Sequence, residues 1–216
     1  MKKIWFAFLY IPFSLFAQSK SKFNDSQKWV DSVYQQMSFK EKVGQLFMVA
    51  AYSNRDEKHV NELLTLVKDN NIGGVIFFQG GPGRQAQITN RLQAASKVPL
   101  FVGIDAEWGL GMRLDSTYVY PWNMTLGAIQ DNKLIEKVGH QMAEQSKRVG
   151  IHFIFGPVVD INTNPLNPII GNRSFGENKE NVSDKAIALM HGLQENQVFA
   201  TAKHFPGHGD TATDSH

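Results

Sequence analysis

The chain has 216 residues, of which 22 are Lys or Arg and 20 are Asp or Glu, and it contains no cysteine. This near balance of charge, without a basic stripe along the sequence, argues against a nucleic-acid partner. Without cysteine there is neither a disulfide nor thiolate chemistry, so a hydrophobic core alone must stabilise the fold.

Residues 1–17 are typical of an export signal, since Lys2 and Lys3 precede an apolar run and Ala17 precedes a plausible cleavage site. The run is too short to span a bilayer comfortably, and no other segment approaches about 20 apolar residues. We therefore expect an exported protein, periplasmic or extracellular, with no stable membrane span once the signal is removed. A retained N-terminal anchor is the alternative.

Residues 18–37 are interpreted as a polar lead-in that continues into a helix with one apolar side. Ser38 and Glu41 have the spacing of a capping box and predict the start of a second, short helix. The sequence thus divides into a signal at 1–17, the lead-in at 18–37 and one domain at 38–216.

Five continuous apolar runs predict buried strands at residues 46–51, 74–78, 100–104, 151–155 with a continuation to 161, and 198–202. Continuous rather than alternating apolarity is typical of parallel strands that are covered on both faces.

Apolar residues at helical spacing separate these strands. The sets are Val60, Leu63, Leu64 and Val67; Ala86, Ile88, Leu92 and Ala95; Leu134, Ile135, Val138, Met142 and Val149; and Val182, Ala186, Leu189 and Leu193. Alternating strands and helices predict an α/β fold, either an open doubly wound sheet or a (β/α)8 TIM-type barrel.

Polar residues at the ends of successive strands favour the barrel, which presents its functional groups there. An open sheet gathers them mainly at one switch point instead. The strand-end residues are Asp105 and Glu107 after the third run, Asp160 and Asn162 after the fourth, and Lys203 and His204 after the fifth. Because a barrel needs eight strands, we expect this chain to hold about the first five βα units.

Asp214 and His216 are two residues apart, so on an extended loop their side chains leave the same side of the backbone. The carboxylate can orient the imidazole and raise its pKa. Such a histidine can give a proton to a leaving group and later take one from water. The alternative is a loop histidine that merely pairs with an acid.

Other candidates lie at the strand ends and on nearby loops. Lys203 can contact substrate hydroxyls or neutralise an acid across the barrel mouth, and His208 is expected to hold its loop by hydrogen bonds. Asp105 can accept hydrogen bonds from hydroxyls, with Trp108 offering a flat face to a sugar ring. Arg113 can add a charge-assisted contact, although a salt bridge that closes the glycine-rich turn is equally open.

Residues 80–84, Gly-Gly-Pro-Gly-Arg, lack the lysine and hydroxyl of a phosphate-binding loop and predict a simple strand-to-helix turn. We expect no cofactor. A zinc site is a weaker alternative, because its spacing matches no standard pattern and Lys203 would oppose a cation. Its ligands would be His204, His208, Asp210, Asp214 and His216.

At these residues the chain resembles glycoside hydrolase family 3, and within it the bacterial β-N-acetylglucosaminidases. The most specific likeness is the run KHFPGHG at 203–209 followed by DSH at 214–216. Supporting motifs are GGVIFF at 73–78, the segment 105–113, FGPVVDI at 155–161 and NRSFGE at 172–177.

The resemblance implies a partial N-terminal barrel domain at 38–216 and retaining hydrolysis through a covalent glycosyl-enzyme. It implies that the terminal sugar is contacted by Asp105, Arg113, Arg173, Lys203 and His204. It further implies that His216 is the acid/base and Asp214 its orienting partner, with a nucleophilic aspartate beyond residue 216.

The expected activity is that of an exported, exo-acting β-N-acetylglucosaminidase acting on peptidoglycan fragments or chitooligosaccharides. The alternatives are a family β-glucosidase or glycoside phosphorylase, a sugar-binding barrel without catalysis, and a metal-dependent hydrolase. Residues 106–109 read Ala-Glu-Trp-Gly where many members have Gln-Glu-Gly-Gly, so the pocket edge is expected to differ. The 216-residue piece alone is expected to be inactive and poorly stable, because its fifth strand would have an unpaired edge.

Overall fold

The computed structural model describes residues 17–214. Residues 1–16, which make up almost all of the expected signal, and His216 lie outside this range. Within it, no helix combines the length and the apolar character needed to cross a membrane.

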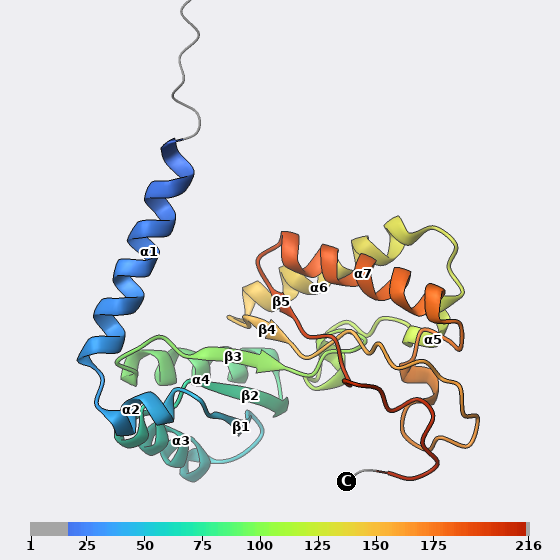
Figure 1. The fold of residues 1–216 in the computed structure, drawn as a ribbon. Coiled ribbons are helices and arrows are strands. Elements are labelled where there is room, and N and C mark those ends of the chain that lie inside the picture. Colours follow the sequence, from blue (N-terminus) through green and yellow to red (C-terminus); the bar gives the residue numbers. More distant parts are fainter. Residues whose placement is uncertain (1–16, 215–216) are drawn as a thin grey trace, which may run out of the picture.

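Five parallel strands form one sheet in the order β1-β2-β3-β4-β5 (Figure 1). Their bounds are Met48–Tyr52, Gly74–Gln79, Phe101–Ile104, Phe153–Ile154 and Phe199–Ala200. Each strand pairs with the next one in sequence, as in a barrel, whereas a doubly wound sheet reverses direction at its switch point. The fold is therefore a partial (β/α)8-type barrel with β1 and β5 at its edges.

The fourth and fifth strands are shorter than expected. The predicted continuation of β4 to residue 161 is wrong, because no regular strand follows Ile154 there. Pro157 has no N–H to donate to a ladder. Pairing nevertheless resumes at a bridge between Val158 and Lys203. This bridge matters for the site, because it holds Lys203 against the segment that follows β4.

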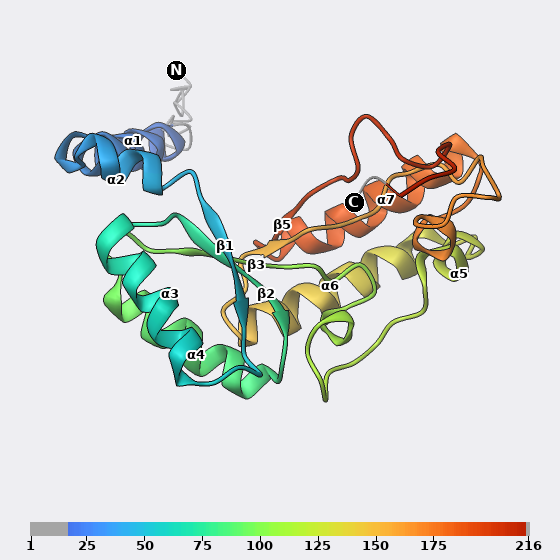
Figure 2. The same ribbon diagram turned by 90° about the horizontal axis from the view of Figure 1, so that it is seen from below.

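Helices cover the outer face of the sheet (Figures 1 and 2). They are α3 (Glu57–Asn70), α4 (Pro82–Ala95), α6 (Asn132–Arg148) and α7 (Lys179–Glu195), with the short α5 (Asn123–Gly127) beside the end of the sheet that carries the site. The predicted apolar sets supply much of the core, including Leu63, Leu92, Met142 and Leu189. Leu134 is the exception, because its side chain is 46% exposed at the start of α6.

The opposite face of the sheet carries a cluster of aromatic rings in edge-on and stacked contacts. Phe101 and Phe199 each pack against Phe153, with ring centroids 5.4 and 4.8 Å apart. Phe101 and Phe199 are about half exposed. This is the face that a complete barrel encloses.

Residues 17–36 form one helix, α1 (Ala17–Gln36), which projects from the rest of the fold in Figure 1. The predicted lead-in is thus helical over its whole length. The capping box is confirmed at α2 (Phe39–Gly44), where the backbone N–H of Glu41 donates to the Ser38 hydroxyl and Glu41 accepts from the Ser38 N–H.

Two glycines allow α6 and α7 to pack closely. A Cβ at Gly192 would lie 2.1 Å from the Glu136 carbonyl oxygen, and one at Gly139 would lie 2.5 Å from that of Leu189. Because these obstacles are backbone atoms, a side chain at either position must push the helices apart.

We expect Gly192→Ala to destabilise the protein by roughly 1–3 kcal/mol, because the clash outweighs the better helix propensity of alanine. Gly83→Ala on α4 is the matched control, since a Cβ there meets nothing within 4 Å. Urea denaturation of the intact protein measures both. A Gly192→Ala variant as stable as the control would contradict the close packing of α6 on α7.

Candidate active site

The carboxyl ends of β3 and β5 bring two acids and a lysine together. Asp105 and Glu107 follow β3 directly, and Lys203 lies three residues after β5. Backbone pairing fixes the height of Lys203, whose N–H donates to the Pro157 carbonyl (3.1 Å) while its carbonyl accepts from Val159 N–H (2.6 Å). The three side chains therefore share one edge of the sheet.

An ionic cluster of five side chains, Asp105, Glu107, Arg113, Arg173 and Lys203, forms at this edge. Lys203 Nζ lies 3.0 Å from Asp105 Oδ1 and 2.8 Å from Glu107 Oε1. Arg113 Nη2 donates to Asp105 Oδ2 at 2.7 Å, and Arg173 binds both carboxylate oxygens of Glu107 at 2.9 and 2.8 Å. The four residues of this group that are expected to contact a sugar thus form one network with Glu107, whose side chain is 0% exposed.

Burial alone raises the pKa of the Asp105 carboxyl, but Lys203 and Arg113 outweigh it and hold that pKa below its usual value. Burial likewise opposes ionisation of Glu107, and its hydrogen bonds to Arg173 and Lys203 lower the pKa overall. The bond to Glu107 in turn raises the pKa of Arg173. These directions favour the charged forms of Asp105, Glu107 and Arg173 near neutral pH.

A second carboxylate, Asp160, holds the histidine segment. Its side chain is 0% exposed, and Oδ2 lies 2.7 Å from Nδ1 of His204. The backbone N–H groups of His204 and His208 donate to Oδ2 and Oδ1 at 3.2 and 2.6 Å. The Asp160 carboxylate thus accepts from the His204 ring and from two backbone N–H groups, which leaves Nε2 of His204 as the ring nitrogen not bound to Asp160.

The loop at 205–214, called here the histidine loop, packs on the segment after β4. His208 accepts from Asn167 Nδ2 through its carbonyl, and its Nδ1 lies 3.0 Å from Thr211 Oγ1. This agrees with the expectation that His208 holds the loop. Beside it lies a hollow of about 410 Å³ lined in part by Asp160, Thr163 and Asp210. Asp214 lies exposed at the end of the described chain, and its pairing with His216 stays a prediction.

The two remaining features considered in the sequence, the 80–84 turn and the zinc alternative, have other roles in the structure. Residues 80–84 form the turn into α4, and Arg84 donates to the Ser53 carbonyl (3.0 Å) and to Asp115 (3.1 Å). The histidines of the zinc alternative that the structure describes, His204 and His208, are engaged with Asp160 and Thr211 instead.

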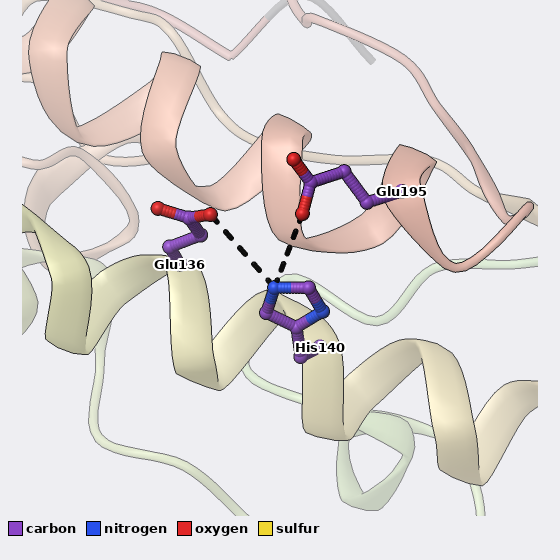
Figure 3. A group of neighbouring side chains, drawn as sticks. All are labelled: Glu136, His140 and Glu195. Atoms are coloured by element: carbon purple, nitrogen blue, oxygen red, sulfur yellow. Dashed lines mark ion pairs between the residues drawn. The ribbon is translucent and has the colours of Figure 1, made fainter.

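In the described part of the chain, a different trio has ligand atoms close enough to share a metal ion: Glu136, His140 and Glu195 (Figure 3). His140 Nε2 lies 3.3 Å from Glu195 and 3.8 Å from Glu136. Asn196 Nδ2 contacts Nδ1 and also donates to the Gly192 carbonyl. Nε2 of His140 thus faces the two carboxylates, and these contacts link α6 to α7.

Sequence reasoning placed Glu107 and Asp160 at strand ends but assigned neither to the site. Glu107 binds Arg173 and Lys203. Asp160 accepts hydrogen bonds from the backbone N–H groups of His204 and His208. The available signal was their position, since both follow continuous apolar runs. Which carboxylate turns inward depends on the tertiary fold.

A barrel with charged and hydrogen-bonding groups at the carboxyl ends of its strands defines an enzyme-type domain. The family model for the glycosyl hydrolase family 3 N terminal domain matches residues 38–216. The chain therefore belongs to glycoside hydrolase family 3, as the motifs indicated.

Known relatives extend this result. The chain is 38% identical over 168 residues to a beta-hexosaminidase A from Pseudoalteromonas piscicida, covering 72% of this chain and 28% of that one. It matches the structure of a family 3 beta-N-acetylglucosaminidase from a Paenibacillus species with TM-score 0.75 and 36% identity, over 83% and 35% of the two chains. A beta-glucoside phosphorylase bound to 2FGlc matches with TM-score 0.80 and 29% identity, over 87% and 33%. The chain spans less than half the length of these relatives.

We expect Glu107→Ala to cost about 3 kcal/mol of unfolding free energy, because Arg173 and Lys203 lose the buried carboxylate between them. The lowered pKa values mean that the carboxylates' stabilisation is fully present above about pH 5, beyond the unfolded-state pKa values, and is lost as pH falls through the lowered values of the folded state. The variant should therefore lose less stability on acidification than the wild type.

Urea denaturation at several pH values measures both effects. Glu177→Ala, at an exposed position, is the control. Equal losses in the two variants would contradict the central role of Glu107.

Proposed function

We propose that the protein containing this chain is a glycoside hydrolase that removes terminal β-linked N-acetylglucosamine. The observation that carries the proposal is the ionic cluster around Glu107, formed by residues at strand ends of a family 3 barrel. The hexosaminidase and N-acetylglucosaminidase relatives support the choice of sugar. Peptidoglycan fragments and chitooligosaccharides are the natural substrates that carry this sugar.

In this proposal the terminal sugar is bound by Asp105, Arg113, Arg173, Lys203 and His204. The ionised Asp105 carboxylate accepts hydrogen bonds from sugar hydroxyls, and Lys203 is close enough to the same point to donate one. His204 offers Nε2 to the sugar, because Nδ1 is already bound to Asp160. Every cation in the cluster already has an acid partner. The mouth of the barrel therefore offers directed hydrogen bonds, which suit a polyhydroxylated ligand.

We further propose that His216 is the acid/base and that Asp214 orients it. The histidine loop that leads to both is anchored through His208 to Asp160 and Asn167. His216 protonates the glycosidic oxygen as the bond to the sugar breaks, and then takes a proton from the incoming water. Export of the protein stays a prediction from residues 1–17.

A phosphorylase is the second candidate, because the structural match with TM-score 0.80 is to a beta-glucoside phosphorylase. The two activities differ in the acceptor, water or inorganic phosphate. Rates of sugar release from glucosides and N-acetylglucosaminides, measured with and without phosphate, separate them.

Asp105→Asn should lower kcat/KM for a terminal N-acetylglucosaminide by roughly 10- to 100-fold, because the amide presents a donor in place of a charged acceptor. Asp115→Asn is the control, since Asp115 is an exposed acid that also pairs with an arginine. Steady-state kinetics of the intact protein give both values. Unchanged kcat/KM in Asp105→Asn would remove this carboxylate from substrate binding.

His216→Ala should slow hydrolysis of substrates with poor leaving groups by roughly 100- to 10,000-fold, the usual contribution of general acid–base catalysis. Activated nitrophenyl glycosides should be affected much less, because their leaving group needs little protonation. His191→Ala, on the exposed side of α7, is the control. If both substrate types kept their wild-type rates, His216 would not be the acid/base.

A further inference from the structure

Two tryptophans lie together next to the ionic cluster. The ring centroids of Trp108 and Trp122 are 4.2 Å apart, with 41° between the ring planes. Trp122 is 46% exposed and Trp108 is partly buried, so an indole surface faces solvent beside a group of charges. We call this pair the tryptophan platform.

Trp108 is held in place by the turn that follows β3. It comes directly after the buried Glu107, and its carbonyl accepts from Tyr120 N–H at 3.0 Å. Gly109 adopts a φ of +92°, and a Cβ there would lie 2.7 Å from the Tyr120 ring. The turn therefore requires glycine at this position, and it fixes the backbone from which the Trp108 ring extends.

Trp122 is tied to the same cluster from the other side. The next residue, Asn123, is buried and donates from Nδ2 to the Arg173 carbonyl at 2.8 Å. Arg173 in turn binds Glu107 through two hydrogen bonds. Each tryptophan is thus one residue away from a group bonded to Arg173, which places the platform at the rim of the ionic cluster.

The chemistry of the platform differs from that of the cluster. The cluster consists of ionisable side chains around the fully buried Glu107, whereas Trp122 is 46% exposed and offers an apolar ring to solvent. Pyranose rings with equatorial substituents have apolar C–H faces that pack on indole rings. A sugar bound there would lie outside the cluster and nearer to solvent than the terminal residue.

We propose that Trp108 and Trp122 form the binding subsite for the sugar ring next to the terminal residue, on the leaving-group side of the bond that is cut. This inference rests on the proposed function for the position of the terminal sugar. It makes the platform a determinant of specificity for substrates of two or more rings.

The test uses the intact protein with two substrates, chitobiose and N-acetylglucosaminyl fluoride, whose leaving group contains no ring. Trp108→Leu and Trp122→Leu should each lower kcat/KM for chitobiose by roughly threefold to tenfold, as expected for one lost aromatic contact. Hydrolysis of the fluoride should change less than twofold. Trp122→Phe should restore most of the loss, because it restores an aromatic face.

Trp29→Leu is the matched control, since Trp29 is an exposed tryptophan on α1, away from the platform (Figure 1). Equal losses on both substrates, or no loss on either, would overturn the platform. If the wild type cleaved neither substrate, the proposed function would fail on its own. In that case the test is quenching of tryptophan fluorescence by chitobiose. Quenching that is seen in the wild type and lost in Trp122→Leu would support the subsite. Absence of quenching in the wild type would overturn the subsite.

Discussion

The site depends on one buried charge, the carboxylate of Glu107. Its side chain is fully removed from solvent, and an ion in that position is costly unless it is paired and hydrogen-bonded. Lys203 after β5 and Arg173 after β4 both bind it. Because these cations come from separate βα units, Glu107 forces the ends of three strands and their loops to converge. Removing both Arg173 and Lys203 would leave an uncompensated charge in the wall of the barrel.

The convergence of these strand ends also determines which charged groups lie at the mouth of the barrel. Asp105 shares Lys203 with Glu107 and takes Arg113 as its own partner, so two acids and three cations form one continuous chain of contacts. The pKa values of both acids are lowered because these cations outweigh burial, chiefly Arg173 with Lys203 at Glu107 and Lys203 with Arg113 at Asp105. The positions of hydrogen-bond donors and acceptors are fixed before a ligand arrives, which reduces the entropy lost on binding.

The sequence predicted the five parallel strands well, because continuous apolar runs report burial on both faces. It predicted the length of β4 poorly, since Pro157 interrupts a run that remains apolar as far as Ile161. Leu134 was misassigned because apolar residues at a helix start need not face the core. The fold brings Asp105, Arg113, Arg173 and Lys203 into one ionic cluster, and their contact with a sugar stays a prediction. The local sequence does not encode whether such a side chain forms a salt bridge or binds a ligand. The burial that singles out Glu107 and Asp160 exists only in the folded chain.

The peptide that joins Lys203 to His204 connects the two buried carboxylates. Lys203 binds Glu107 and Asp105, while His204, the next residue, binds Asp160, which also holds the N–H of His208. A shift of the β5 end therefore moves the ionic cluster and the start of the histidine loop together. On the other side, Arg173 connects Glu107 to Asn123 and thus to the tryptophan platform. The proposed sugar site and the loop that leads to the proposed acid/base are in this way held by the same backbone, which is what a reaction needs when a proton must reach one particular oxygen.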